Sequence, residues 1–127
     1  MTSVVGVGID LVDVARLRSA MARRPGFATR VFTDRERDTP ATGGRAIERL
    51  AARFAAKEAT MKALGVGLGA FALRDVEVVV DEGGRPSLRL HGAAVERAGR
   101  LGVRSLVVSL SHTATLASAV VVAESGT

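Results

Sequence analysis

Residues 51–64 read Ala51-Ala52-Arg53-Phe54-Ala55-Ala56-Lys57-Glu58-Ala59-Thr60-Met61-Lys62-Ala63-Leu64. Ala, Leu, Met, Glu, Lys and Arg are all good helix formers. The stretch therefore predicts the second half of a long helix that begins near Gly44. Three glycines at alternate positions, from Gly65 to Gly69, are expected to end this helix. We expect the rest of the chain to be organised around it.

The position of Glu58 in this helix is unusual for a surface carboxylate. At about 100° per residue, Glu58 falls near the middle of an apolar stripe. The members of that stripe are Ile47, Leu50, Ala51, Phe54 and Met61. An isolated buried charge is too costly, so a carboxylate on a buried face must be protonated, paired or bound to a metal. Glu58 is therefore a candidate site residue.

The two lysines of the chain lie beside Glu58. Of the 18 basic residues 16 are Arg, and the lysines are Lys57 and Lys62. One interpretation is an ordinary surface pair, because Glu58 and Lys62 are one helical turn apart. The other interpretation is functional, since a Lys ammonium is a compact point charge that suits phosphate.

The composition limits the classes of protein to consider. With 127 residues, of which 47% are hydrophobic, we expect one folded domain over residues 1–127. No apolar run approaches the length of a membrane-spanning helix, and the N-terminus has no signal-peptide pattern. We therefore expect a cytoplasmic protein that does not enter a membrane. The absence of Cys excludes disulfides and thiolate metal sites and leaves oxygen ligands, which suit Mg²⁺ or Ca²⁺.

The formal net charge of +5 indicates an anionic partner, such as nucleic acid, a phosphate-rich cofactor or an acidic protein. Without Trp or Tyr and with only four Phe, the chain is a poor match for proteins that stack single-stranded bases on aromatic rings. A duplex-binding module that uses Arg remains an alternative. Arg16, Arg23 and Arg24 lie off the apolar side of a helix predicted for residues 13–24. They form either a solvated basic face or a docking surface for an acidic helical partner.

Strand and helix patterns divide the rest of the chain into short elements. Val4–Asp10 reads as a strand, and Gly6 and Gly8 indicate that a backbone or a ligand comes close to one of its faces. Thr33 and Glu36 have the spacing of a capping box. The remaining predicted elements are a hairpin of residues 74–80 and 85–90, a helix over 92–101, and strands over 105–112 and 116–124. The order βαααββαββ predicts the α+β class with an antiparallel sheet.

Three stretches make the sequence resemble the holo-acyl-carrier-protein synthase family of 4′-phosphopantetheinyl transferases. They are residues 6–16, which run from Gly-Val-Gly-Ile-Asp to Val-Ala-Arg, residues 53–65 around Lys57-Glu58 and Lys62, and residues 108–112, Val-Ser-Leu-Ser-His. Their spacing matches the short, stand-alone members of the family, and the similarity covers essentially the whole chain. The resemblance implies the fold of that family, a single small domain with an antiparallel sheet and a long central helix.

The resemblance also implies a reaction, in which the phosphopantetheine arm of coenzyme A is transferred to a serine of an acidic apo acyl carrier protein. Adenosine 3′,5′-bisphosphate is released. By the same likeness Asp10 and Glu58 hold Mg²⁺, and these two residues and Lys62 are the implied catalytic residues. The implied coenzyme A site comprises Arg53, Lys57, Lys62, Gly65, Arg85, Pro86 and His112.

Two departures from the family pattern bear on this site. Val66 stands where many relatives have the Thr of Gly-Thr-Gly, and Thr113 stands where some relatives have Asp after the His. The second departure puts a third metal-binding carboxylate in doubt. The resemblance further implies a homotrimer with active sites between subunits and a role in fatty-acid or polyketide synthesis. The nucleic-acid-binding alternative explains the charge of +5 but not the position of Glu58.

Overall fold

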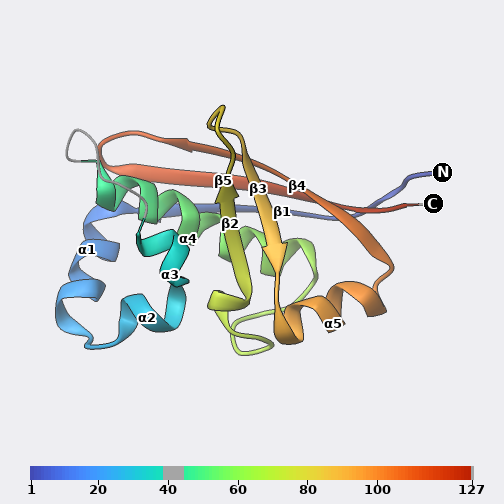
Figure 1. Cartoon of the computed structure of the whole chain (residues 1–127), viewed down its shortest axis with the longest axis horizontal. Helices are drawn as coiled ribbons and strands as arrows, with labels where there is room; N and C mark the ends of the chain where they lie inside the picture. Colours follow the sequence, from blue (N-terminus) through green and yellow to red (C-terminus); the bar gives the residue numbers. More distant parts are fainter. Residues whose placement is uncertain (39–44, 127) are drawn as a thin grey trace.

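The computed structural model of the protein describes residues 1–38 and 45–126 and has the predicted α+β architecture (Figure 1). Its main sheet is antiparallel, with the strand order β1-β5-β4. These strands are β1 (Val4–Asp13), β4 (Val103–His112) and β5 (Leu116–Ser125). A separate hairpin pairs β2 (Val76–Val80) with β3 (Pro86–Leu90).

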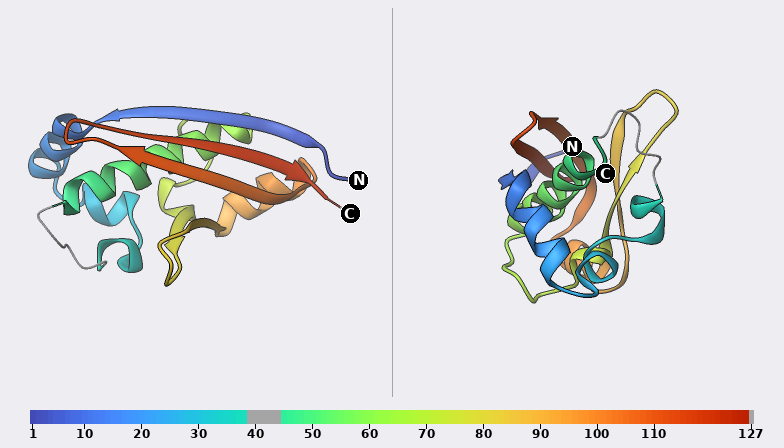
Figure 2. Two further views of the ribbon diagram at one scale, coloured as in Figure 1. Left: turned by 90° about the horizontal axis from the view of Figure 1, so that it is seen from above. Right: turned by 90° about the vertical axis from the view of Figure 1, so that its left-hand side faces the viewer.

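Helix α4 (Ala46–Ala63) crosses the inner face of the main sheet (Figure 2). The other helices are α1 (Val14–Arg23), α2 (Phe27–Val31), α3 (Asp34–Arg37) and α5 (Gly92–Arg100). In Figure 1, α1 and α5 lie at opposite ends of the molecule. Within the described ranges, no helix is both long and apolar enough to cross a membrane.

The contact between β1 and α4 is closer than side chains on both elements would allow. A Cβ atom on Gly6 would lie 1.9 Å from the carbonyl oxygen of Ala63, and one on Gly8 would lie 1.8 Å from that of Ala59. The helix contributes small side chains here, and those of Ala55 and Ala59 are fully buried. The prediction that a backbone approaches the glycine face of β1 is therefore confirmed, and that backbone belongs to α4.

The outer face of the main sheet is apolar and open to solvent. On β1 the side chains of Val7, Ile9 and Leu11 point away from α4 and are 58%, 66% and 65% exposed. The side chain of Val107 on β4 is also exposed, at 50%. No segment among the described residues covers the outward side chains of β1. Apolar residues repeated along one strand face indicate a surface that another molecule covers.

Strand β1 is longer than predicted. It pairs with β5 as far as Asp13, opposite Leu116, so Asp10 lies within the strand and not at its end. Its neighbour there is Ala119. The first strand of the hairpin is shorter than predicted, because Leu73–Asp75 forms a 3₁₀ turn before β2 begins.

The capping box is confirmed and has a consequence for the helix order. The hydroxyl of Thr33 accepts a hydrogen bond from the amide of Glu36, and the Glu36 carboxylate accepts one from the amide of Thr33. This capping box opens the separate helix α3, so four α-helices precede the hairpin among the described residues, where the prediction had three. Asp13 caps α1 by accepting a hydrogen bond from the amide of Arg16. The predicted start of the long helix near Gly44 lies outside the described residues.

Replacing Gly8 by Ala is expected to destabilise the fold strongly, because the new methyl group would overlap the backbone of Ala59. Overpacking usually costs about 1–3 kcal/mol, and a clash with backbone belongs at or above the upper end. Gly67→Ala is the control, because nothing lies within 4 Å of a Cβ at that position. Thermal unfolding followed by circular dichroism should show a large fall in Tm for Gly8→Ala alone. Equal Tm values for the two variants would contradict the tight β1–α4 contact.

Candidate active site

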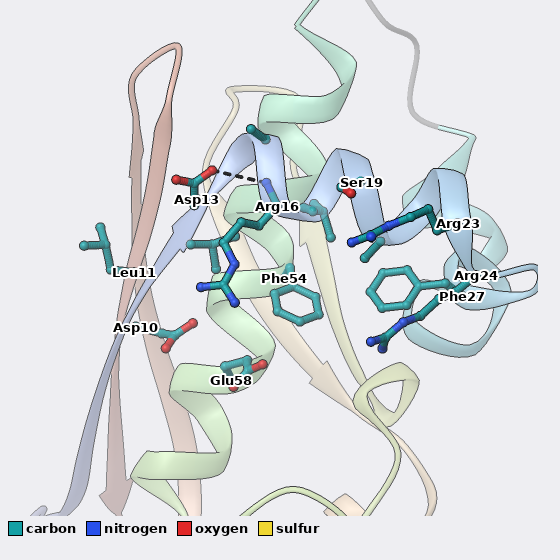
Figure 3. Close-up of a pocket in the computed structure, with 14 residues that line it drawn as sticks. Asp10, Leu11, Asp13, Arg16, Ser19, Arg23, Arg24, Phe27, Phe54 and Glu58 are labelled. Carbon is teal, nitrogen blue, oxygen red and sulfur yellow. Dashed lines mark hydrogen bonds between the residues drawn. The ribbon is translucent and has the colours of Figure 1, made fainter.

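A pocket of about 610 Å³ lies where the end of β1, helix α1 and the middle of α4 meet (Figure 3). Strand β1 contributes Asp10 to its lining, and α4 contributes Glu58. The basic and aromatic residues of the lining are Arg16, Arg23, Arg24, Phe27 and Phe54. Asp13, which caps α1, also lines the pocket, so three carboxylates and three arginines surround it.

Asp10 lies close enough to Glu58 to influence the ionisation of the Glu58 carboxyl. The helical period predicted a buried position for Glu58, and the structure shows its side chain half-buried. Burial raises the pKa of the Glu58 carboxyl, the negative charge of Asp10 raises it further, and Lys62 acts in the opposite direction. In Figure 3 the side chain of Arg16 points toward these two carboxylates. The pair thus gains stability from any cation placed between its members.

The chemistry of this donor set fits Mg²⁺. Mg²⁺ is commonly bound through one or two carboxylates while water and phosphate oxygens complete its shell. Asp10 and Glu58 supply two such carboxylates from different elements. Among the described residues no cluster of three or more His, Cys, Asp or Glu is arranged to hold a metal. A metal here would therefore depend on oxygens from outside these side chains.

Lys62 contacts β1 and is not simply the surface partner of Glu58. Its Nζ donates to the carbonyl oxygen of Ile9 at 2.9 Å and to Oδ1 of Asp10 at 3.2 Å. The Lys62 side chain is 54% exposed, and that of Asp10 is 15% exposed. An isolated pair within the helix would have made neither contact. Lys62 therefore joins α4 to the strand that carries Asp10 and keeps its ammonium open to a ligand.

Lys57 is placed differently from the prediction. Its side chain is fully buried, and its Nζ donates to Oε1 of Glu36 at 2.7 Å and to the carbonyl oxygens of Leu73 and Val76. Burial lowers the pKa of Lys57, an effect that the charge of Glu36 opposes. All three ammonium hydrogens have protein acceptors, so Lys57 cannot contact a ligand in this structure. The resemblance had placed it among the residues of the coenzyme A site.

Arg53 lies on α4 before Glu58, and Gly65 follows the end of that helix. Arg53 is largely buried, and its Nη1 donates to the carbonyl oxygen of Glu36 at 2.8 Å. Gly65 ends the helix with a φ of 71°, a conformation that favours glycine. Val66 follows and packs against the core. Neither Arg53 nor Gly65 lines the pocket.

Arg85, Pro86 and His112 also lie outside the pocket lining. Arg85 and Pro86 belong to the turn and first residue of β3. His112 ends β4, with its Nδ1 4.0 Å from Oε2 of Glu48 on α4. The structure therefore brings together Asp10, Glu58 and Lys62 and leaves the other predicted coenzyme A contacts apart from them. The hydroxyl of Thr113 accepts from the amide of Leu116 within the β4–β5 turn.

Sequence reasoning missed Phe27 and one role of Glu36. The rings of Phe27 and Phe54 stack with centroids 6.2 Å apart and form an aromatic part of the pocket wall. Because these two residues are 27 positions apart in the sequence, no periodic pattern could predict their contact. Glu36 was predicted as part of a capping box, and its buried carboxylate also binds Lys57. The only sequence signal for this contact was the helical position of Lys57, which did not match a solvent-exposed lysine.

The sequence model of the 4′-phosphopantetheinyl transferase superfamily matches residues 6–117. The chain belongs to this superfamily. It is a transferase of that class, as the following likenesses also indicate. The chain is 52% identical to the holo-[acyl-carrier-protein] synthase of Streptomyces avermitilis, and the match covers 96% of this chain and 98% of that protein.

Two solved structures have the same fold. A holo-(acyl-carrier-protein) synthase from Bacillus anthracis, in complex with CoA (3′,5′-ADP), matches with 34% identity and a TM-score of 0.79 over 97% of this chain and 98% of that one. The holo-[acyl-carrier-protein] synthase from Neisseria meningitidis matches with 32% identity and a TM-score of 0.83 over 95% and 98%. The predicted family and fold are thus confirmed.

Glu58→Gln is expected to keep or raise thermal stability when no metal is present. The raised pKa of Glu58 means that the ionised carboxylate is disfavoured in the folded state, so the amide removes an unfavourable charge. Melting followed by circular dichroism at neutral pH with a chelator would check this. Added Mg²⁺ should raise the Tm of the parent protein and leave that of Glu58→Gln unchanged. A clear fall in metal-free Tm for Glu58→Gln would contradict the assignment of a repelled carboxylate pair.

Proposed function

We propose that this transferase moves the 4′-phosphopantetheine arm of coenzyme A to a serine of an apo acyl carrier protein, using Mg²⁺. The observation that carries the proposal is the meeting of Asp10 and Glu58 at one pocket, with Lys62 bonded to Asp10 beside it. The likeness to holo-[acyl-carrier-protein] synthases supports the choice of substrates. The product released would be adenosine 3′,5′-bisphosphate, and the pathway served would be fatty-acid or polyketide synthesis in the cytoplasm.

In the proposed step, the serine hydroxyl gives up its proton to solvent as its oxygen forms a bond to the phosphorus that carries the pantetheine. The bond from that phosphorus to the bridging diphosphate oxygen breaks, and the nucleotide leaves with that oxygen. Asp10 and Glu58 would hold Mg²⁺, which supplies positive charge against the diphosphate when it is bound.

Lys62 would act on the leaving side of the reaction. Two of its ammonium hydrogens are directed to the Ile9 carbonyl and to Asp10, and the third has no acceptor among the described residues. Held in this way, the ammonium can donate to a phosphate oxygen without a large loss of side-chain freedom. It would also limit the repulsion between Asp10 and Glu58.

The carrier would dock over the arginines of α1. Arg16, Arg23 and Arg24 line the rim of the pocket, and Phe27 and Phe54 form an apolar part of its wall (Figure 3). Positive charge at the rim would steer an acidic protein toward the carboxylate pair. In the alternative interpretation, a solvated basic face, these three arginines would have no role in binding.

Assembly into a homotrimer is part of the proposal. The open apolar face of β1, with Val7, Ile9 and Leu11 more than half exposed, supports contact with further copies of the chain. The chain would be one domain over residues 1–127. A nucleic-acid-binding module remains the competing hypothesis, supported by the net charge of +5. Two carboxylates at the centre of the basic rim would repel a phosphate backbone unless a metal were present.

The proposal is tested by incubating the protein with coenzyme A, Mg²⁺ and an apo acyl carrier protein and measuring the mass of the carrier. A gain equal to one phosphopantetheine group is expected, and a chelator should abolish it. Salt-dependent binding of duplex DNA, with no change in carrier mass, would favour the nucleic-acid hypothesis.

Lys62→Arg is expected to lower kcat by roughly tenfold or more, which corresponds to about 1.4 kcal/mol of transition-state stabilisation. The guanidinium keeps the charge but is larger and planar, so it cannot reproduce the contacts of Nζ to Ile9 and Asp10. The Tm should stay nearly unchanged, because the side chain is 54% exposed. Steady-state kinetics with the apo carrier would measure the effect. An unchanged kcat would remove Lys62 from the catalytic residues.

Reversal of the charges at Arg23 and Arg24 to Glu is expected to raise the KM for the carrier by roughly tenfold, while the KM for coenzyme A stays the same. The effect should weaken as salt increases, because exposed charges are screened. The matched control is reversal of Arg100 and Arg104, which are exposed and lie at or next to α5, at the opposite end of the molecule (Figure 1). Equal KM values for the two double variants would place the docking face elsewhere.

A further inference from the structure

Helix α2 is too short to hold its own position. It has five residues, and isolated helices shorter than about 12 residues are marginal in water. The amide of Thr33, which would donate to the carbonyl oxygen of Thr29 if the helix continued, donates to Glu36 in the capping box of α3. The last carbonyl groups of α2 therefore need donors from outside the helix.

Arg74 supplies these donors. Its Nη1 donates to the carbonyl oxygen of Thr29 at 2.6 Å and to that of Phe32 at 2.9 Å. A positive charge at the C-terminal end of a helix also interacts favourably with the helix dipole. Arg74 lies in the 3₁₀ turn before β2, 45 positions from Thr29. A distant part of the chain thus anchors α2.

The turn that carries Arg74 is itself fixed on both sides. The carbonyl oxygen of Leu73 accepts from Nζ of Lys57, which belongs to α4, at 3.2 Å. The carbonyl oxygen of Asp75 accepts from the amide of His91, which precedes α5, at 2.8 Å. Because the turn is attached to two other helices, Arg74 holds α2 against a firmly placed part of the fold.

The other end of α2 forms part of the pocket. Phe27, its first residue, stacks on Phe54 of α4, and both rings line the pocket that also contains Asp10 and Glu58 (Figure 3). Both phenylalanines are half-buried, so each ring can still pack against a bound apolar group. A shift of α2 would alter this aromatic wall and leave the two carboxylates on β1 and α4 where they are.

We propose that Arg74 is a positioning residue for the pocket, which holds the end of α2 so that Phe27 stays stacked on Phe54. The inference rests on the proposed function, in which the carrier docks at the arginines of α1 beside these two rings. The carboxylate pair is aligned separately, by the close packing of β1 on α4. Arg74 therefore acts on the KM for the carrier and has little influence on kcat or on the KM for coenzyme A.

Arg74→Met tests the inference, because methionine keeps an unbranched side chain and removes every donor. The KM for the apo carrier should rise by roughly five- to tenfold, with kcat and the KM for coenzyme A changed less than about twofold. The matched control is Asp34→Asn. Oδ1 of Asp34 lies 3.6 Å from Nη2 of Arg74, and this variant removes that ion pair while the bonds to α2 remain. The control should keep the parent KM, and an equal rise in both variants would overturn the proposal.

A double-mutant cycle distinguishes loss of position from loss of stability. If Arg74 acts through the Phe27 ring, Phe27→Leu should itself raise the KM for the carrier. Adding Arg74→Met to Phe27→Leu should then raise the KM further by less than about twofold. Fully additive effects would count against the proposal, because a general loss of stability acts whichever side chain stands at position 27.

Amide hydrogen exchange tests the placement of α2 without any measurement of activity. The amide of Phe32 bonds to Ala28 at the end of α2, and its exchange in Arg74→Met should quicken more than that of Val121 in the central strand β5. If Arg74→Met does not fold, Arg74→Lys replaces it, since the shorter side chain keeps the charge and is expected to lose one of the two bonds. Parent-like exchange at Phe32 in the folded variant would overturn the proposal. A parent protein that transfers no group at all would instead refute the proposed function, and the exchange result would still decide whether Arg74 holds α2.

Discussion

The close contact of the β1 backbone with the α4 backbone is the constraint on which the site depends. Gly6 and Gly8 have no room for a Cβ against the carbonyl oxygens of Ala63 and Ala59. Asp10 follows Gly8 on the same face of the strand, and Glu58 precedes Ala59 on the helix. The two carboxylates therefore meet because the two backbones do. A helix held one side-chain layer farther away would have separated them by several ångströms.

Electrostatics then account for the surroundings of the carboxylate pair. Burial and the charge of Asp10 both raise the pKa of Glu58. Positive charge nearby therefore stabilises the ionised form of Glu58 beside Asp10. The protein supplies part of that charge through Lys62, which bonds to Asp10, and through Arg16, which points toward the pair (Figure 3). A pocket of this kind favours a metal together with an anionic group. Such an arrangement suits a transferase whose substrate carries a diphosphate.

The two lysines show how one helix can use the same side chain for different purposes. Lys57 and Lys62 are separated by just over one turn, so they leave the helix in different directions. Lys62 reaches the solvent-accessible edge near Asp10, whereas Lys57 enters the interior and meets Glu36. Arg dominates elsewhere in the chain. At both of these positions a compact ammonium with three donors satisfies acceptors that a planar guanidinium would not match.

The sequence alone determined the features that arise from local spacing. The alternation along β1, the long Ala-rich helix, the capping box at Thr33 and the family motifs around Glu58 all predicted the fold correctly, because each depends on residues within a few positions of one another. Tertiary structure decided what the charged side chains contact. Lys57 lies 21 positions from Glu36 and Lys62 lies 52 from Asp10, and helical periodicity carries no information across such separations. Which lysine is buried depends on the packing of α3 and the hairpin against α4, where desolvation must be compensated by partners that only the folded chain brings near.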